Sequence, residues 1–146
     1  MDLTKSYPRS AKDKMAGLVS LGRMTDKARA FNEGHLGEYH YDCPHDKPVL
    51  AFLGIDAATF AAKVAELKDD DAIERWVTVA LLPKKTAAEI ADFNEERTNW
   101  RPDPGTPSAK YFAELREEVA PGRPEIVTWF DLLDLDEKRP VELSHA

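Results

Sequence analysis

The chain has 146 residues, the length of one domain, and its 42% hydrophobic and 32% charged residues are the composition of a globular protein. Its net charge is −7, of which residues 1–50 carry +1 and the remainder −8. Because an acidic surface repels phosphate backbones and the sequence has no basic stripe, we expect no nucleic acid as a partner.

The first third of the chain predicts two helices. Ser10 is placed to cap a first helix with an apolar stripe through Met15 and Leu18. A second helix follows, in which Met24, Ala28 and Phe31 recur at spacings of four and three and so share one face. Gly34 is placed to end it, because glycine adopts the left-handed conformation at little cost.

Two more helices are predicted after residue 45. Asp46 is placed to cap the first, with Pro48 in its first turn, where proline is tolerated because those N–H groups lack intrahelical partners. Gly54 ends this helix, and Asp56 caps the next one, DAATFAAKVAEL.

Capping-box patterns mark the helices in the middle of the chain. Asp71 with Glu74 is predicted to open a helix that Pro83 ends. Thr86 with Glu89 is predicted to open the next.

The stretch NWRPDPGTPS, from Asn99 to Ser108, holds three prolines and a glycine and is predicted to be a loop. Thr106 or Ser108 then starts a helix. Thr128 with Asp131 starts the last helix, TWFDLLDL.

These signals predict an all-α fold: a compact single-domain bundle of six to seven short helices over residues 1–146, with one extended strap at residues 37–44. The strap reads GEYHYDCP, and the residue before a proline avoids the helical region. In an extended strap the side chains alternate. The expected inward set is Tyr39, Tyr41 and Cys43, and the opposite set is Glu38, His40 and Asp42.

The strap region is rich in reactive side chains, which leaves several kinds of chemistry open. Zinc accepts imidazole and thiolate, but the spacing H-x4-H-x2-C-x-H of His35, His40, Cys43 and His45 matches no motif, so we predict no metal site. Cys43 precedes a predicted helix N-terminus and is a candidate nucleophile, with His40 or His45 as base. Glu38 and His40 form a candidate acid–base pair. The alternatives are an inert, half-buried thiol and a solvated polar edge.

Basic residues near the N-terminus favour a site for an anion. Arg23 and Lys27 lie one helical turn apart, and arginine presents a planar fork to carboxylate or phosphate. The predicted ligand-binding residues are Arg9, Arg23, Lys27, Tyr39, His40 and Tyr41. The alternative is ion pairing within the chain, since Asp26 and Glu33 lie on the same helix.

The run SYPRSAKDKMAGLVSLGRMTDKARA followed by LGEYHYDCPHD resembles the bacterial domain-of-unknown-function family five-zero-six-nine. The shared order is a PRS start, a helix reading L-x-R-M-x-D-K-x-R-A, a GEYHY strap with a Cys-Pro, and a G-I/V-D helix start. The resemblance implies a single-domain, cytoplasmic bacterial protein and supplies no reaction. His45 departs from the family pattern, which is apolar there, and this argues against His45 as a metal ligand.

We therefore predict a binding protein whose N-terminal helices and strap form a pocket for a small anionic ligand or a partner segment. The alternative is an enzyme that uses Glu38, His40 or Cys43 for acid–base or nucleophilic chemistry, with or without the help of a metal ion. No cofactor is expected, and a homodimer is a further possible assembly. A single cysteine, an N-terminus without an apolar core, and no apolar run near the ~20 residues that span a bilayer favour a cytoplasmic protein away from membranes.

Overall fold

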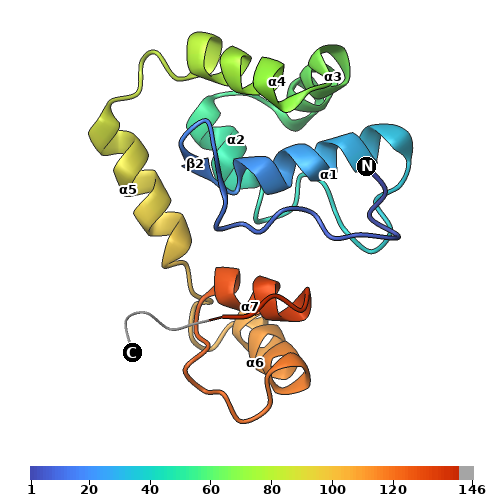
Figure 1. Cartoon of the computed structure of the whole chain (residues 1–146). Coiled ribbons are helices and arrows are strands. Elements are labelled where there is room, and N and C mark those ends of the chain that lie inside the picture. The colour runs from blue at the N-terminus through green and yellow to red at the C-terminus, as the bar shows by residue number, and fades with distance from the viewer. Residues whose placement is uncertain (142–146) are drawn as a thin grey trace. The chain divides into compact units, whose positions relative to one another are not determined.

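The computed structural model describes residues 1–141, and over this range the regular secondary structure is helical apart from one short hairpin, which confirms the predicted all-α class (Figure 1). In chain order the elements are β1 (Lys14–Met15), β2 (Leu18–Val19), α1 (Leu21–Glu33), α2 (Lys47–Leu53), α3 (Ala57–Leu67), α4 (Asp70–Trp76), the π-helix η1 (Val77–Leu81), α5 (Ala87–Thr98), α6 (Pro107–Val119) and α7 (Trp129–Asp136).

The chain divides into two compact units, Met1–Asn94 (unit 1) and Glu95–Ala146 (unit 2), and we describe each by itself. A single domain over residues 1–146 stays a prediction, and its last residues, 142–146, lie outside the described residues.

The first predicted helix is wrong, because this segment forms the hairpin. β1 pairs antiparallel with β2. The two residues between them, Ala16 and Gly17, have φ of 52° and 78°, the left-handed values that a two-residue hairpin turn requires. This backbone leaves no continuous helix for Ser10 to cap.

Helix α1 begins after Ser20 and ends at Gly34, which has φ 72° as predicted. Met24 and Ala28 are fully buried, and α1 packs against α3 and β1. Phe31, expected on the same buried face, is half exposed, because it lies in the last turn of the helix.

Helices α2 and α3 begin and end near the predicted residues. Asp56 caps α3 by accepting a hydrogen bond from Thr59 N at 2.7 Å. Asp46 precedes α2 but makes no side-chain cap to it.

No single helix among residues 1–141 is long and apolar enough to cross a membrane. Over the same range, only α2 and α3 taken together, bent by 80° at their junction, are long and apolar enough.

The capping box predicted for α4 is wrong, and the one predicted for α5 is confirmed. Asp69 caps α4 through Ala72 N, and Glu74 instead accepts from the hairpin amide of Ala16 at 3.1 Å. Thr86 and Glu89 exchange both capping hydrogen bonds.

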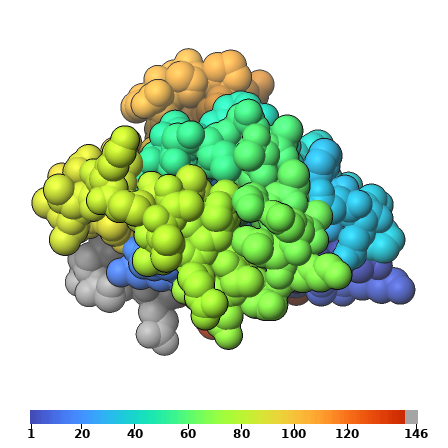
Figure 2. All heavy atoms as spheres, turned by 90° about the horizontal axis from the view of Figure 1, so that it is seen from above, coloured from blue at the N-terminus to red at the C-terminus, as the bar shows by residue number. Residues whose placement is uncertain are grey.

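Helices α3, α4 and η1 follow one another in contact on the face of unit 1 seen in Figure 2.

Unit 2 consists of the end of α5 with α6 and α7, which pack against each other. Thr106 and Thr128 cap α6 and α7 as predicted. Trp129, from α7, packs against Phe112 of α6, and its backbone N–H donates to the carbonyl of Trp100 at 3.0 Å. The loop before α6 is thereby tied to the apolar core of this unit.

We predict that Asn94→Ala destabilises unit 1. The Asn94 amide accepts from Val19 N at 3.0 Å and donates to Gly17 O at 2.9 Å, so one side chain joins α5 to the hairpin. Losing two hydrogen bonds should lower the free energy of unfolding by about 1–3 kcal/mol, measured by urea denaturation.

Asn99→Ala is the matched control, because its amide makes one exposed hydrogen bond, to Glu95 O. It should cost less than about 1 kcal/mol. Equal losses for the two variants would contradict the role given to Asn94.

Candidate functional site

The strap, residues 37–44, follows α1 and lies outside regular helix or strand. Its exposure alternates as predicted: Glu38, His40 and Asp42 are exposed, whereas Tyr39, Tyr41 and Cys43 are half-buried. Gly37 and Asp42 have φ of 61° and 63°, so the chain turns at both positions, and the strap is less continuously extended than predicted.

Gly37 is required where the strap begins. Its positive φ disfavours a side chain, and a Cβ there would lie 3.2 Å from Leu3 O and 3.3 Å from Thr4 Cγ2. The N-terminal segment therefore approaches the strap more closely than another residue would allow.

Lys27 holds the end of the strap on α1. Its ammonium lies 2.9 Å from Asp46 Oδ2 and 3.2 Å from Cys43 Sγ, and the residue is only 3% exposed. The same Asp46 oxygen accepts hydrogen bonds from the backbone N–H groups of Asp42 and Cys43. Asp46 was predicted as a helix cap, but its carboxylate turns back to the strap and the lysine.

Arg23 contacts the middle of the strap. Its guanidinium carbon lies 5.7 Å from the centre of the Tyr39 ring, a cation–π contact. Its Nη1 donates to Arg9 O at 3.3 Å. Three of the predicted ligand-binding residues are therefore neighbours, although Arg23 is only 5% exposed.

Tyr41 joins the strap to α3. Its hydroxyl donates to Ala57 O at 2.6 Å, and its ring centre lies 5.2 Å from that of Phe31. Burial raises the pKa of Tyr41 far above its usual value, and the negative charges of Asp46 and Asp42 raise it further. The hydroxyl therefore stays protonated and acts as a hydrogen-bond donor.

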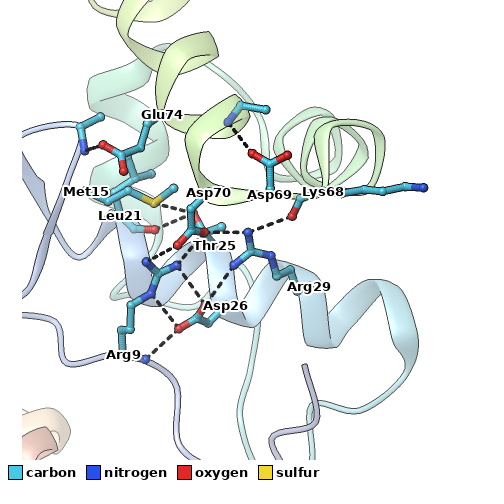
Figure 3. A network of polar contacts seen from close by, with 12 residues as sticks. Arg9, Met15, Leu21, Thr25, Asp26, Arg29, Lys68, Asp69, Asp70 and Glu74 are labelled. Atoms are coloured by element: carbon cyan, nitrogen blue, oxygen red, sulfur yellow. Dashed lines mark hydrogen bonds and ion pairs between the residues drawn. The ribbon is translucent and has the colours of Figure 1, made fainter.

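A network of alternating charges joins α1 to the N-terminal segment and to the start of α4 (Figure 3). Asp26, 3% exposed, accepts from Arg9 N at 2.9 Å and pairs with Arg9 Nη2 at 3.0 Å and Arg29 Nη1 at 3.3 Å. Both arginines also reach Asp70 at the start of α4, Arg9 at 2.9 Å and Arg29 at 2.7 Å. Two arginines and two carboxylates thus join the N-terminal segment, α1 and α4.

The network shifts the pKa values of Arg9 and Asp70. Burial lowers the pKa of Arg9, but hydrogen bonds to Asp26 and Asp70 and the charges of both carboxylates together outweigh burial, and the pKa is raised. Burial raises the pKa of Asp70, but hydrogen bonds and charge from Arg29 and Arg9 outweigh it, and that pKa lies below its usual value.

The ion-pairing alternative is confirmed for several of the basic residues. Arg29 pairs with Asp26 on the same helix, Arg9 pairs with Asp26, and Lys27 pairs with Asp46. Sequence reasoning missed Asp70 as a partner, since nothing local connects it with Arg9, 61 residues earlier. Binding of an anion by these side chains stays a prediction.

The candidate catalytic residues occupy different settings. Glu38 and His40 are exposed on the outer side of the strap, and Cys43 is half-buried beside Lys27. Their pairing and catalytic roles stay predictions.

His35 Nδ1 lies 3.7 Å from Glu33 Oε2. Within residues 1–141 no group of three or more His, Cys, Asp or Glu is arranged to hold a metal ion.

Comparison with known proteins places the chain in a family. Residues 5–139 match the family described as Domain of unknown function (DUF5069). The match covers most of the chain, which therefore belongs to this family, as the sequence resemblance indicated. No curated protein matches the chain.

We predict that Lys27→Met strongly destabilises the protein. Methionine keeps the length of the side chain but leaves the carboxylate of Asp46 buried without its cation. Breaking a buried pair in this way should cost about 3–5 kcal/mol of unfolding free energy, measured by urea denaturation.

Lys47→Met is the matched control, because Lys47 pairs with Asp42 at 3.0 Å on the surface, with side chains 62% and 43% exposed. Its loss should be below about 1 kcal/mol. A similar loss in both variants would show that the burial of Lys27 does not matter.

We also predict that Asp70→Asn makes stability less dependent on pH. Because its pKa is lowered in the folded state, Asp70 stabilises the fold above its unfolded pKa of about 4, and this contribution is lost as the pH falls through the folded-state pKa. The wild type and the variant should therefore differ more at about pH 6 than at about pH 3 in urea unfolding. A difference that is constant with pH would refute this account, and Asp71→Asn, at an exposed neighbour, is the control.

Proposed function

We propose that unit 1 of this DUF5069 protein is a binding module, and that the face formed by the strap and the end of α1 receives a segment of a partner protein. The observation that carries the proposal is the pair formed by Phe31 and Tyr41. Phe31 is 50% exposed, and its ring lies against a tyrosine that is itself fixed to α3.

An exposed aromatic pair of this kind is suited to binding. Aromatic side chains bury large areas of apolar surface and are enriched among the residues that dominate interface energies. Phe31 comes from α1 and Tyr41 from the strap, and Tyr39 continues the half-buried row along the strap. We refer to these three residues as the aromatic face.

The aromatic face is held in place before any partner arrives. Tyr39 is covered by Arg23, Tyr41 donates to Ala57 O, and the following turn is tied to Lys27 through Asp46. A surface that is already ordered loses little conformational entropy on binding, which favours affinity.

The basic side chains give less support to a small anionic ligand. Arg9 and Lys27 each lie within 3.0 Å of a carboxylate of the same chain. An anionic ligand would have to displace these carboxylates, and the displaced charges of Asp26 and Asp46 would then be buried and unpaired. The aromatic face requires no such exchange, so we favour the partner segment over the small anion.

We predict that Phe31→Ala weakens binding of a peptide selected for this face. A displayed library of random peptides, selected against the full chain, supplies the probe, and calorimetry measures its affinity for each variant. Loss of a central aromatic contact should weaken the affinity by about tenfold or more, equivalent to about 1.4 kcal/mol.

Tyr111→Ala is the matched control, since Tyr111 is an exposed aromatic residue, 58% exposed, in unit 2. It should leave the affinity unchanged. If the selected peptides bind both variants, Phe31→Ala included, with the same affinity as the wild type, the proposal is contradicted. A chain that dimerises through Phe31, detected by light scattering, would identify a second copy as the occupant of the face.

A further inference from the structure

Lys27 and Cys43 bring an amine and a thiol into contact. Lys27 Nζ lies 3.2 Å from Cys43 Sγ, although the residues are 16 apart in the chain. The lysine is 3% exposed and comes from the middle of α1, whereas the cysteine is half-buried and comes from the strap. The cysteine residue is thus partly accessible to solvent, and the lysine beside it is enclosed.

This contact is fixed by its surroundings. Asp46 Oδ2 binds Lys27 Nζ at 2.9 Å and accepts from Cys43 N at 3.3 Å, so one carboxylate holds both partners. The lysine nearest to the strap in sequence, Lys47, is directed to Asp42 at 3.0 Å. The two side chains therefore meet because of the fold rather than by chance encounter of flexible chains.

We infer that Lys27 and Cys43 form a reversible oxidative cross-link, a sulfenamide bond between Nζ and Sγ, when hydrogen peroxide oxidises the cysteine. Sulfenic acids condense with a backbone nitrogen to form a sulfenamide, and the lone pair of a lysine amine in contact with the sulfur can attack it in the same way. The inference does not depend on the proposed binding function.

The first step oxidises the sulfur. Cys43 Sγ attacks one oxygen of hydrogen peroxide, an S–O bond forms and the O–O bond breaks. The sulfur loses two electrons to the peroxide, the second oxygen leaves as water with the thiol proton, and a sulfenic acid remains.

The second step joins the two residues without further oxidant. The Lys27 ammonium gives a proton to the Asp46 carboxylate, which passes it to solvent, and the free amine lone pair attacks Sγ. The N–S bond forms as the S–O bond breaks, and the hydroxyl group leaves as water with a second proton from the amine. Relative to the reduced protein, the chain loses two hydrogen atoms.

The bond would tie the strap covalently to α1, in place of an ion pair and a hydrogen bond. A thiol reductant would reverse it by attack at the sulfur, as in disulfide exchange. The site is thus a redox-controlled covalent link between the strap and α1, which the ion pair and hydrogen bond of the reduced side chains do not provide.

Mass spectrometry of the full-length wild-type chain, treated with hydrogen peroxide, tests the inference. The intact mass should fall by about 2 Da and return after dithiothreitol. A tryptic digest should show residues 24–29, which contain Lys27, joined to residues 30–63, which contain Cys43.

Three controls make the result specific. Cys43→Ser should abolish the joined peptides, Lys47→Arg should leave them in place, and peroxide treatment of the wild type unfolded in guanidinium should reduce their yield at least tenfold. Oxidation of Cys43 to the sulfinic acid with no joined peptides, or a link to any lysine other than Lys27, would overturn the inference. Neither result would bear on peptide binding at the aromatic face, so the two proposals fail separately.

Discussion

The ion pair between Lys27 and Asp46 is the interaction on which the strap depends. Two charges are costly to bury unless they are paired and their remaining hydrogen-bonding positions are satisfied. Here the ammonium lies 2.9 Å from Asp46 Oδ2, and the same oxygen accepts from the amides of Asp42 and Cys43. One buried carboxylate therefore joins a side chain of α1 to the backbone of the strap, and lifting the strap would leave a buried charge unpaired.

Helix α1 presents buried charges in two directions. Asp26 forms ion pairs with Arg9 and Arg29. Its neighbour Lys27 forms an ion pair with Asp46 at the end of the strap. Consecutive residues of a helix point about 100° apart, so a charged pair of neighbours can join two different segments. A run such as RMTDKA resembles a solvated surface, yet in this helix all six of its residues, 23–28, are buried in unit 1.

Features that depend on neighbouring residues could be predicted from the sequence, whereas contacts between distant segments could not. The caps at Asp56, Thr86 and Thr128 depend on residues three positions apart, and their signals are local. The alternation along the strap also follows from adjacent residues. The turn that makes the first segment a hairpin requires Ala16 at φ 52°, which residue preference does not indicate. The contact of Arg9 with Asp70 depends on the whole fold, and no local pattern reports it.

The same distinction bears on function. Basic residues at helical spacing favoured an anion site in the sequence, because this spacing shows that side chains share one face of a helix. The spacing does not show whether a carboxylate from another segment pairs with them. Once those pairs are made, the charges contribute to the architecture, and the groups that unit 1 presents near the strap include aromatic rings and a thiol. Under the proposed binding function, recognition would depend on burying the rings of Phe31 and Tyr41, and the buried charges would act by holding those rings in position.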